Sequence, residues 1–410
     1  MKRNTIPTRM FLEFLLAMLL GICAGIITGL LPGVHINLVS LLLLSAAPVL
    51  LQYVNVVSLC VFIVSMAVMH SFLDVVPSIL LGAPDNEASA MLLPGHRMLL
   101  QGRGFHAIKL TLIGSLFCLL ITIALLPFLL ILIAYINEPL NAWMGIILLA
   151  LVVFLLLRDA RRWQNLLVFS LSGVLGLIVL NMPMLKDPLF PLLSGLFGVS
   201  ALIAGMQSKV KIPRQKKEEQ QASMKKGVIA KALLGGSFAG VMTAFFPGVG
   251  PAQGAALSTT FLRNLGDEGY LILVGGIGTV NFVMSLVTLF AIEKARNGAV
   301  LVIMQLVGQT SEDVLFVLLA VAVFVAGTGM VSSLWISRVF AEWIVRVDYA
   351  AMSAIVVCFV TFLVFVMTGW IGLLVLAVST SLGLLIGAWG VARSHAMGCL
   401  ILPVLLYFLL

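Results

Sequence analysis

The sequence predicts an all-α polytopic membrane protein with about 10–12 transmembrane helices. Of its 410 residues, 61% are hydrophobic and only 10% are charged, whereas a soluble domain carries roughly 25% charged residues. The mean hydropathy is correspondingly high, at +1.18. Long apolar stretches, such as residues 110–134, 351–368 and 371–391, approach the ~20 residues that a spanning helix needs. Because the bilayer core offers no water to backbone groups, these stretches must pair their backbones internally as helices.

The basic residues predict the orientation of the chain. Lys2, Arg3 and Arg9 precede an apolar run that continues without a small-residue cleavage site, so this run is expected to be the first membrane helix. The net charge of +8 gathers in short loops, which the positive-inside rule places in the cytoplasm. We therefore expect a multi-pass protein of the cytoplasmic membrane with a cytoplasmic N-terminus. The basic clusters are Lys2/Arg3/Arg9, Arg97/Arg103/Lys109, Arg158/Arg161/Arg162 and residues 209–231.

A polar linker at residues 207–228 divides the chain into halves, 1–206 and 229–410. The segment from Gly25 to Val34 matches the segment from Gly240 to Val249, because glycine, threonine, proline, glycine and valine recur at a constant offset of 215 residues. A repeat centred on a linker predicts two homologous membrane halves.

The relative orientation of the halves depends on residues 36–53. Inverted repeats need an odd number of crossings between Pro32 and Pro247, which holds if residues 36–53 cross the membrane. If that segment is re-entrant, the basic loops give an even number instead. We expect inverted repeats, although the sequence allows either an odd or an even number of crossings.

The repeated Pro-Gly pairs predict two broken or re-entrant helices. Proline lacks an N–H and breaks a helix, and a helix that restarts offers free N–H groups and a positive dipole end to an anion. Matched interruptions in duplicated halves indicate the binding site of a transporter, although a proline kink used for helix packing is the simpler alternative. The candidate substrate-binding residues are Thr28, Pro32, Gly33, Val34, His35 and Asn37 in the first half, and Thr243, Pro247, Gly248, Val249, Gly250 and Gln253 in the second.

Ionisable residues inside spans are energetically unfavourable and are functional candidates by default. His70 and Asp74 are four residues apart on one helix face, and histidine titrates near neutral pH, so the pair could relay a proton. A buried polar pair that only ties helices together is the alternative. Asn281 and Ser285 have the same spacing in the corresponding stretch of the second half, where neutral oxygens would suit Na⁺. These four residues are the ion-coupling candidates, with Na⁺ and H⁺ both open.

Several motifs resemble the tripartite tricarboxylate transporter permease family. They are the paired Pro-Gly-Val breaks, the run Leu93-Pro94-Gly95-His96-Arg97 followed by Gly102-Arg103-Gly104-Phe105 and Ala107, and the stretch with His70, Phe72, Pro77, Gly82, Ala83 and Pro84. The resemblance is most specific over residues 20–115 and 235–300. The short chain, and His35 where the second half has Gly250, look more like a compact archaeal-type branch.

The resemblance implies a large membrane subunit that moves carboxylates with an ion gradient, beside a small membrane subunit and a soluble binding protein. We therefore expect a secondary active transporter for a small organic anion, such as a di- or tricarboxylate. A flippase for an anionic lipid carrier such as a polyprenyl phosphate is the main alternative, and an intramembrane enzyme or structural component is a weaker one.

Neither an enzyme nor a cofactor is expected. The sequence has no HExxH, Gly-x-Ser-x-Gly or Walker phosphate loop, and its five cysteines are scattered singly, which argues against a metal site. The expected partners are the small anion, the lipid bilayer, the two accessory subunits and a second copy of the chain, but no nucleic acid.

Overall fold

A computed structural model of the chain describes residues 8–31, 36–80, 92–158, 161–185, 187–207, 213, 215, 224–246, 250–262, 264–295, 297–308, 311–344 and 349–409. All regular structure in these ranges is helical, as expected. Nine helices there are long and apolar enough to cross a membrane, and a bent pair brings the number to ten. The prediction of an all-α polytopic membrane protein is therefore confirmed.

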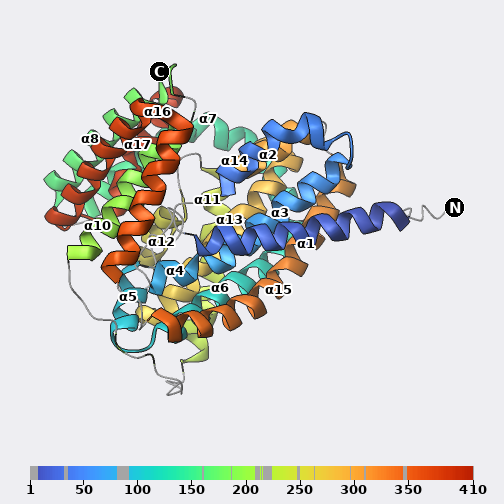
Figure 1. Cartoon of the computed structure of the whole chain (residues 1–410), viewed down its shortest axis with the longest axis horizontal. Helices are drawn as coiled ribbons and strands as arrows, with labels where there is room; N and C mark the ends of the chain where they lie inside the picture. Colours follow the sequence, from blue (N-terminus) through green and yellow to red (C-terminus); the bar gives the residue numbers. More distant parts are fainter. Residues whose placement is uncertain are drawn as a thin grey trace.

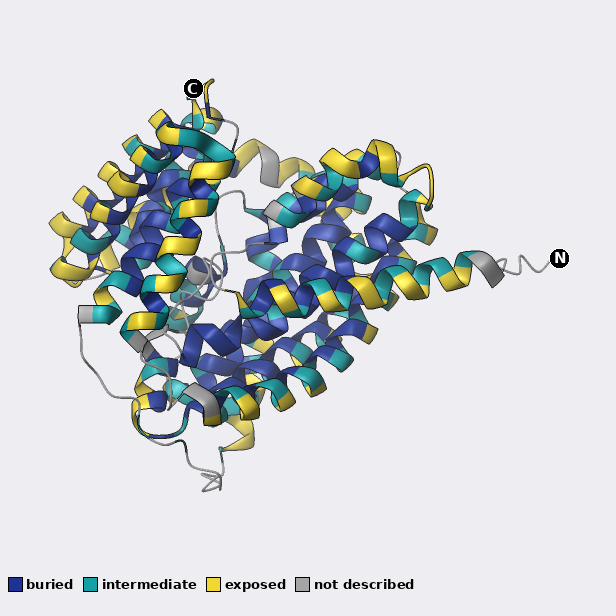
Figure 2. Cartoon of the chain, viewed as in Figure 1, coloured by how far each residue is buried: buried dark blue, intermediate teal, exposed yellow. Residues whose placement is uncertain are grey.

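A central bundle holds the largest hydrophobic core (Figures 1 and 2). Its most deeply buried spans are α3 with α4, where 78% of the spanning window is buried, and α13, where the share is 89%. These helices therefore form the interior, and the others surround them. The helices of the central bundle are α1 (Thr8–Leu30), α2 (Ile36–Leu50), α3 (Val56–Leu73), α4 (Val75–Leu80), α5 (Leu92–Leu100), α6 (Gly104–Ala124), α11 (Lys226–Phe245), α12 (Pro251–Phe261), α13 (Gly266–Ile292), α14 (Gly298–Val307) and α15 (Glu312–Ile344).

A second, peripheral bundle has several smaller cores. Only 17% of the spanning window of α16 is buried, and its exposed face carries large apolar side chains such as Trp370. Such a face is suited to lipid. The helices of this peripheral bundle are α7 (Leu126–Arg158), α8 (Arg162–Leu180), α9 (Leu189–Leu193), the π-helix η2 (Ser194–Val199), α10 (Ser200–Gln207), α16 (Tyr349–Trp389), the 3₁₀ helix η3 (Arg393–Met397) and α17 (Gly398–Leu409).

Two long helices are bent, each at a residue that weakens a helix. The limbs of α7 meet at 92° just after Pro139, which cannot donate a backbone hydrogen bond. In α16, Gly369 has φ 66° and ψ −160°, a conformation that side chains disfavour. The bend in α7 joins the two bundles, because Leu129 on its first limb packs in the central core and Met144 on its second limb packs against α17.

The described helices end and restart where the Pro-Gly pairs predict interruptions. Helix α1 ends at Leu30 and α2 begins at Ile36, while α11 ends at Phe245 and α12 begins at Pro251. The two helix ends are therefore 215 residues apart, and so are the two helix starts. The two bundles each take helices from both sides of the polar linker, and the assignment of the halves to separate domains, like their inversion, stays a prediction.

Candidate functional site

A buried hydrogen bond joins Thr28 at the end of α1 to His70 at the end of α3. The Nδ1 atom of His70 lies 3.1 Å from Thr28 Oγ1, and the Thr28 hydroxyl donates to the carbonyl of Gly25 at 3.3 Å. Which of the two groups donates depends on the ring nitrogen of His70 that carries the proton. When the Thr28 hydroxyl donates to Gly25, its oxygen can accept from an N–H at Nδ1.

The second half contains the same hydrogen-bond arrangement with a different donor. The Thr243 hydroxyl donates to the carbonyl of Gly240 at 3.0 Å, and the Asn281 amide donates from Nδ2 to Thr243 Oγ1 at 2.9 Å. The carboxamide oxygen of Asn281 is thereby left as the acceptor end of the side chain. The imidazole in the first half and the carboxamide in the second thus make equivalent contacts.

Glycines on α1 and α11 set an equivalent register in the two halves. A Cβ atom added to Gly25 would lie 2.6 Å from the Met66 carbonyl oxygen, and one added to Gly240 would lie 3.1 Å from that of Ile277. The glycines are 215 residues apart, and their partners are 211 residues apart. Small residues let membrane helices approach closely, so α1 packs on α3 as α11 packs on α13.

The same register relates Asp74 to Ser285, one turn beyond the hydrogen-bonded residues. Asp74 ends α3, where its backbone N–H donates to the His70 carbonyl at 2.9 Å, and its side chain is largely buried. The Ser285 hydroxyl donates to the Asn281 carbonyl at 2.8 Å. The 211-residue offset that relates His70 to Asn281 also relates Asp74 to Ser285. The four predicted ion-coupling residues therefore occupy two equivalent pairs of positions.

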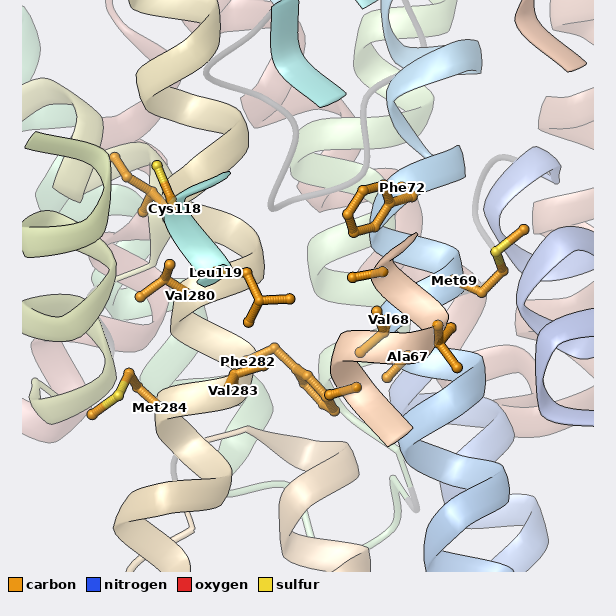
Figure 3. Close-up of a cluster of buried hydrophobic side chains, with 14 of the residues drawn as sticks. Ala67, Val68, Met69, Phe72, Cys118, Leu119, Val280, Phe282, Val283 and Met284 are labelled. Carbon is orange, nitrogen blue, oxygen red and sulfur yellow. The ribbon is translucent and has the colours of Figure 1, made fainter. Parts of the chain in front are cut away.

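Buried apolar side chains flank these polar residues along α3 and α13 (Figure 3). Met69 and Phe72 flank His70 on α3, Val280 and Phe282 flank Asn281 on α13, and α6 adds apolar contacts between the helices. All four flanking side chains are buried. An unpaired polar group in such surroundings is energetically unfavourable, so the threonine hydroxyls stabilise side chains that would otherwise destabilise the bundle.

Gln253 caps α12 and connects the two bundles. Its Oε1 accepts from the backbone N–H of Gly250 at 3.0 Å, and its Nε2 donates to the carbonyl of Ser394 at 3.4 Å. The side chain is fully buried. Both ends of the amide are thus engaged at the start of α12, beside the second interruption.

The remaining substrate-site candidates lie outside the described residues. They are Pro32, Gly33, Val34 and His35 in the first half, and Pro247, Gly248 and Val249 in the second. Asn37 belongs to α2, but its side chain is also outside the described part. The convergence of the two interruptions on one site therefore stays a prediction.

Sequence reasoning missed a set of ion pairs between α5–α6 and α13. Arg97 lies 2.9 Å from Asp267, and Arg103 pairs with Glu268, which also lies 3.5 Å from His106 Nε2. The arginines were interpreted only as topology determinants. The available signal was the acidic doublet at the start of a helix, a position where the helix dipole favours negative charge.

Gln215 of the polar linker packs on the turn between α5 and α6. Gln215 accepts from the Gly104 N–H at 2.8 Å and donates to the Leu99 carbonyl at 3.3 Å. Burial lowers the pKa of His96, so this neighbouring histidine is neutral at pH 7. Two of the basic regions identified in the sequence, the α5–α6 turn and the linker, therefore meet on one face of the protein.

Comparison with known proteins identifies the family. The model of the tripartite tricarboxylate transporter TctA family, a family of transporter permeases, matches residues 15–398. The chain is also 27% identical over 404 residues to the uncharacterized protein MJ1079 of Methanocaldococcus jannaschii, covering 96% of this chain and 99% of the relative, so the relative is similarly compact. No solved structure gives a significant match. The chain belongs to the tripartite tricarboxylate transporter TctA family.

Proposed function

We propose that this permease is a secondary active transporter that moves a small organic anion across the cytoplasmic membrane, driven by a Na⁺ or proton gradient. The anion is a di- or tricarboxylate. The observation that carries the proposal is the matched pair of threonine-centred hydrogen bonds beside the two helix interruptions. Thr28 lies two residues before the end of α1, and Thr243 lies two residues before the end of α11.

The interruptions supply the chemistry for an anion. A helix that restarts within the membrane presents unpaired N–H groups and the positive end of its dipole. Helix α12 begins at Pro251 and α2 begins at Ile36, one after each interruption. A carboxylate bound there would accept backbone hydrogen bonds without requiring an arginine in the membrane core.

An ion gradient is the energy source that fits the chain. The sequence contains no Walker phosphate loop, and the polar pairs next to the interruptions combine titratable groups with neutral oxygens. His70 and Asp74 suit a proton, whereas Thr243, Asn281 and Ser285 suit a hard cation such as Na⁺.

The orientation proposed from the basic loops has support in the fold. The α5–α6 turn, with Arg97 and Arg103, contacts Gln215 of the linker, so two basic regions share one face. We assign that face and the N-terminus to the cytoplasm. By analogy with the family, the proposed partners are a small membrane subunit and a soluble binding protein. A second copy of this chain is a further proposed partner.

Substrate class is tested with purified protein reconstituted in liposomes. Labelled succinate, malate and citrate are compared with labelled leucine and glucose for uptake under imposed Na⁺ and proton gradients. The proposal predicts uptake of at least one carboxylate, and competition by the others but not by leucine or glucose. Absence of uptake for all carboxylates under every gradient contradicts it.

The same liposomes test the flippase alternative. A fluorescent polyprenyl phosphate placed in the outer leaflet is followed by quenching with a membrane-impermeant reductant. Acceleration of its transfer without any carboxylate uptake would establish lipid flipping as the function. Carboxylate uptake without lipid transfer supports the proposed transporter.

A further inference from the structure

We infer that the two matched sites have divided roles, with His70 as the residue that takes up and releases the coupling proton and Asn281 as its neutral counterpart. The inference rests on the proposed function, and it assigns the proton as the coupling ion. It starts from the equivalence of the two sites in the fold. The glycine contacts of α1 on α3 and of α11 on α13 follow one register, so the difference between the sites is one of side-chain chemistry.

His70 and Asn281 make the same hydrogen bond. Each is hydrogen-bonded to a threonine hydroxyl, and each threonine hydroxyl donates a hydrogen bond to a glycine carbonyl three residues earlier. The opposite end of each side chain is Nε2 in His70 and Oδ1 in Asn281. The imidazole is a base that can add a proton, whereas the carboxamide is not.

The proton step conserves charge and requires no other reactant. A proton that enters from one side adds to the ring nitrogen of neutral His70 that carries no hydrogen, and the imidazolium so formed donates from Nδ1 to Thr28 Oγ1. A proton then leaves the ring toward the other side, and the imidazole returns to its neutral form. While it is charged, the imidazolium favours the binding of an anion, and by linkage the anion favours protonation.

Asp74 is an acidic residue one helical turn beyond His70. Its backbone N–H is bonded to the His70 carbonyl at 2.9 Å, and its side chain is 8% exposed. The equivalent position holds Ser285, which carries no charge. The first site therefore combines a base and an acid where the second has an amide and a hydroxyl.

The helices packed on α3 hold their described charges far from His70. Helix α15 approaches α3 near His70 at Gly329, where an added Cβ would lie 3.2 Å from the Phe72 side chain. The charged residue of α15 nearest to Gly329 is Arg338, which is roughly 14 Å further along the helix at 1.5 Å per residue. On α1, Glu13 is about 22 Å from Thr28 by the same rise. Helices α2, α4 and α14 contain no titratable residue. The other titratable residues on the helices that contact α3 are Arg9 and Cys23 of α1, Cys60 of α3, Asp267, Glu268 and Tyr270 of α13, and Glu312, Asp313 and Glu342 of α15.

Exchanging the two side chains tests the inference. The variants are His70→Asn, which copies the second site onto the first, and Asn281→His, which does the reverse. Proton uptake on addition of the transported carboxylate is measured in weakly buffered detergent solution with a pH-sensitive dye, and uptake into liposomes is measured with and without an inward proton gradient. His395→Asn is the matched control, because His395 is as buried as His70, at 4% exposure each, but lies in η3 of the peripheral bundle.

The wild type is expected to take up close to one proton per carboxylate bound, and His395→Asn to do the same. His70→Asn should lose at least nine-tenths of that proton uptake and of the stimulation by a proton gradient. Asn281→His should raise the proton count above that of the wild type, an outcome that does not depend on the stability of the first variant. If His70→Asn keeps the wild-type proton count, or if the wild type responds only to Na⁺, the inference is overturned while the transport function stands. Absence of any carboxylate uptake by the wild type overturns the proposed function itself.

Discussion

The Oγ1 atom of Thr28 lies 3.1 Å from Nδ1 of His70, and this contact ties the last turn of α1 to the last turn of α3. It is available because Gly21, Gly25 and Gly29 bring the α1 backbone close to α3. Gly236 and Gly240 do the same for α11 on α13, where Thr243 meets Asn281. Close helix packing and the polar pairs are therefore parts of one arrangement.

Removing either threonine hydroxyl should impair transport. Thr28→Val and Thr243→Val keep the shape of the side chain but leave a buried N–H without its acceptor, which costs about 1–3 kcal/mol. We expect initial uptake rates to fall by about tenfold, the equivalent of ~1.4 kcal/mol. Thr361→Val is the control, because the Thr361 hydroxyl donates to the Val357 carbonyl within the same helix, the largely exposed α16. Equal rates in all three variants would show that the hydroxyls have no part in transport.

A methyl group at Gly240 should destabilise the fold. The added Cβ would lie 2.6 Å from the Val280 Cβ, and overpacking of this kind costs about 1–3 kcal/mol. Gly278→Ala is the control in the partner helix, because no atom lies within 4 Å of its added Cβ. Melting temperatures in detergent should fall for Gly240→Ala and be unchanged or higher for Gly278→Ala. The reverse order would refute the close approach of α11 and α13.

The two ion pairs of the α5–α6 turn should differ in strength. The side chains of Arg97 and Asp267 are 61% and 36% exposed, whereas those of Arg103 and Glu268 are 30% and 19% exposed. Exposed pairs contribute about 0–1 kcal/mol, so Arg97→Met should change stability little. Arg103→Met should lower the melting temperature more, because it removes the arginine partner of the less exposed Glu268. Double-mutant cycles with Asp267→Asn and Glu268→Gln give the two coupling energies, and equal values would contradict this ranking.

The Pro-Gly interruptions themselves give a prediction that rests on the sequence. Gly33→Leu and Gly248→Leu place a bulky side chain where backbone N–H groups are proposed to meet the substrate. Both variants should assemble in the membrane and show no uptake. Membrane insertion is checked by protease protection and uptake by labelled carboxylate. Normal transport by either variant would show that its interruption is only a kink.

Asp74 should matter for coupling to a pH gradient. Asp74→Asn keeps the size of the side chain and most of its hydrogen-bonding capacity but cannot exchange a proton. The dependence of uptake on external pH, measured with and without Na⁺, should therefore flatten relative to the wild type. Superimposed pH profiles would exclude Asp74 from coupling and favour sodium binding by Thr28, Thr243 and Asn281.

The sequence predicted the features that depend on local chemistry. Apolar length gave the membrane class, and proline with glycine located the ends of α1 and α11. The helical spacing of His70 and Asp74 marked them as one unit, and the parallel spacing of Asn281 and Ser285 marked their counterpart. These signals are readable because helix breaking and helix periodicity act within a few residues.

Partner choice between helices could not be predicted in the same way. Glycines four residues apart indicate close packing but do not say which helix approaches, so the contact between Thr28 and His70 was not foreseen. The sharing of helices between the two bundles was also hidden, because apolar faces toward lipid and toward protein have similar composition. The ion pair of Arg103 with Glu268 joins positions 165 residues apart, and charge patterning reports only neighbours.

The most direct test of ion-driven anion transport is concentrative uptake by the wild type. Liposomes containing the purified protein are given equal labelled carboxylate inside and outside, and an inward gradient of protons, of Na⁺ or of neither is then imposed. We expect the internal carboxylate concentration to rise above the external one when a proton gradient is imposed, and the rise to collapse when a protonophore is added. Equal concentrations on the two sides under every gradient would contradict it.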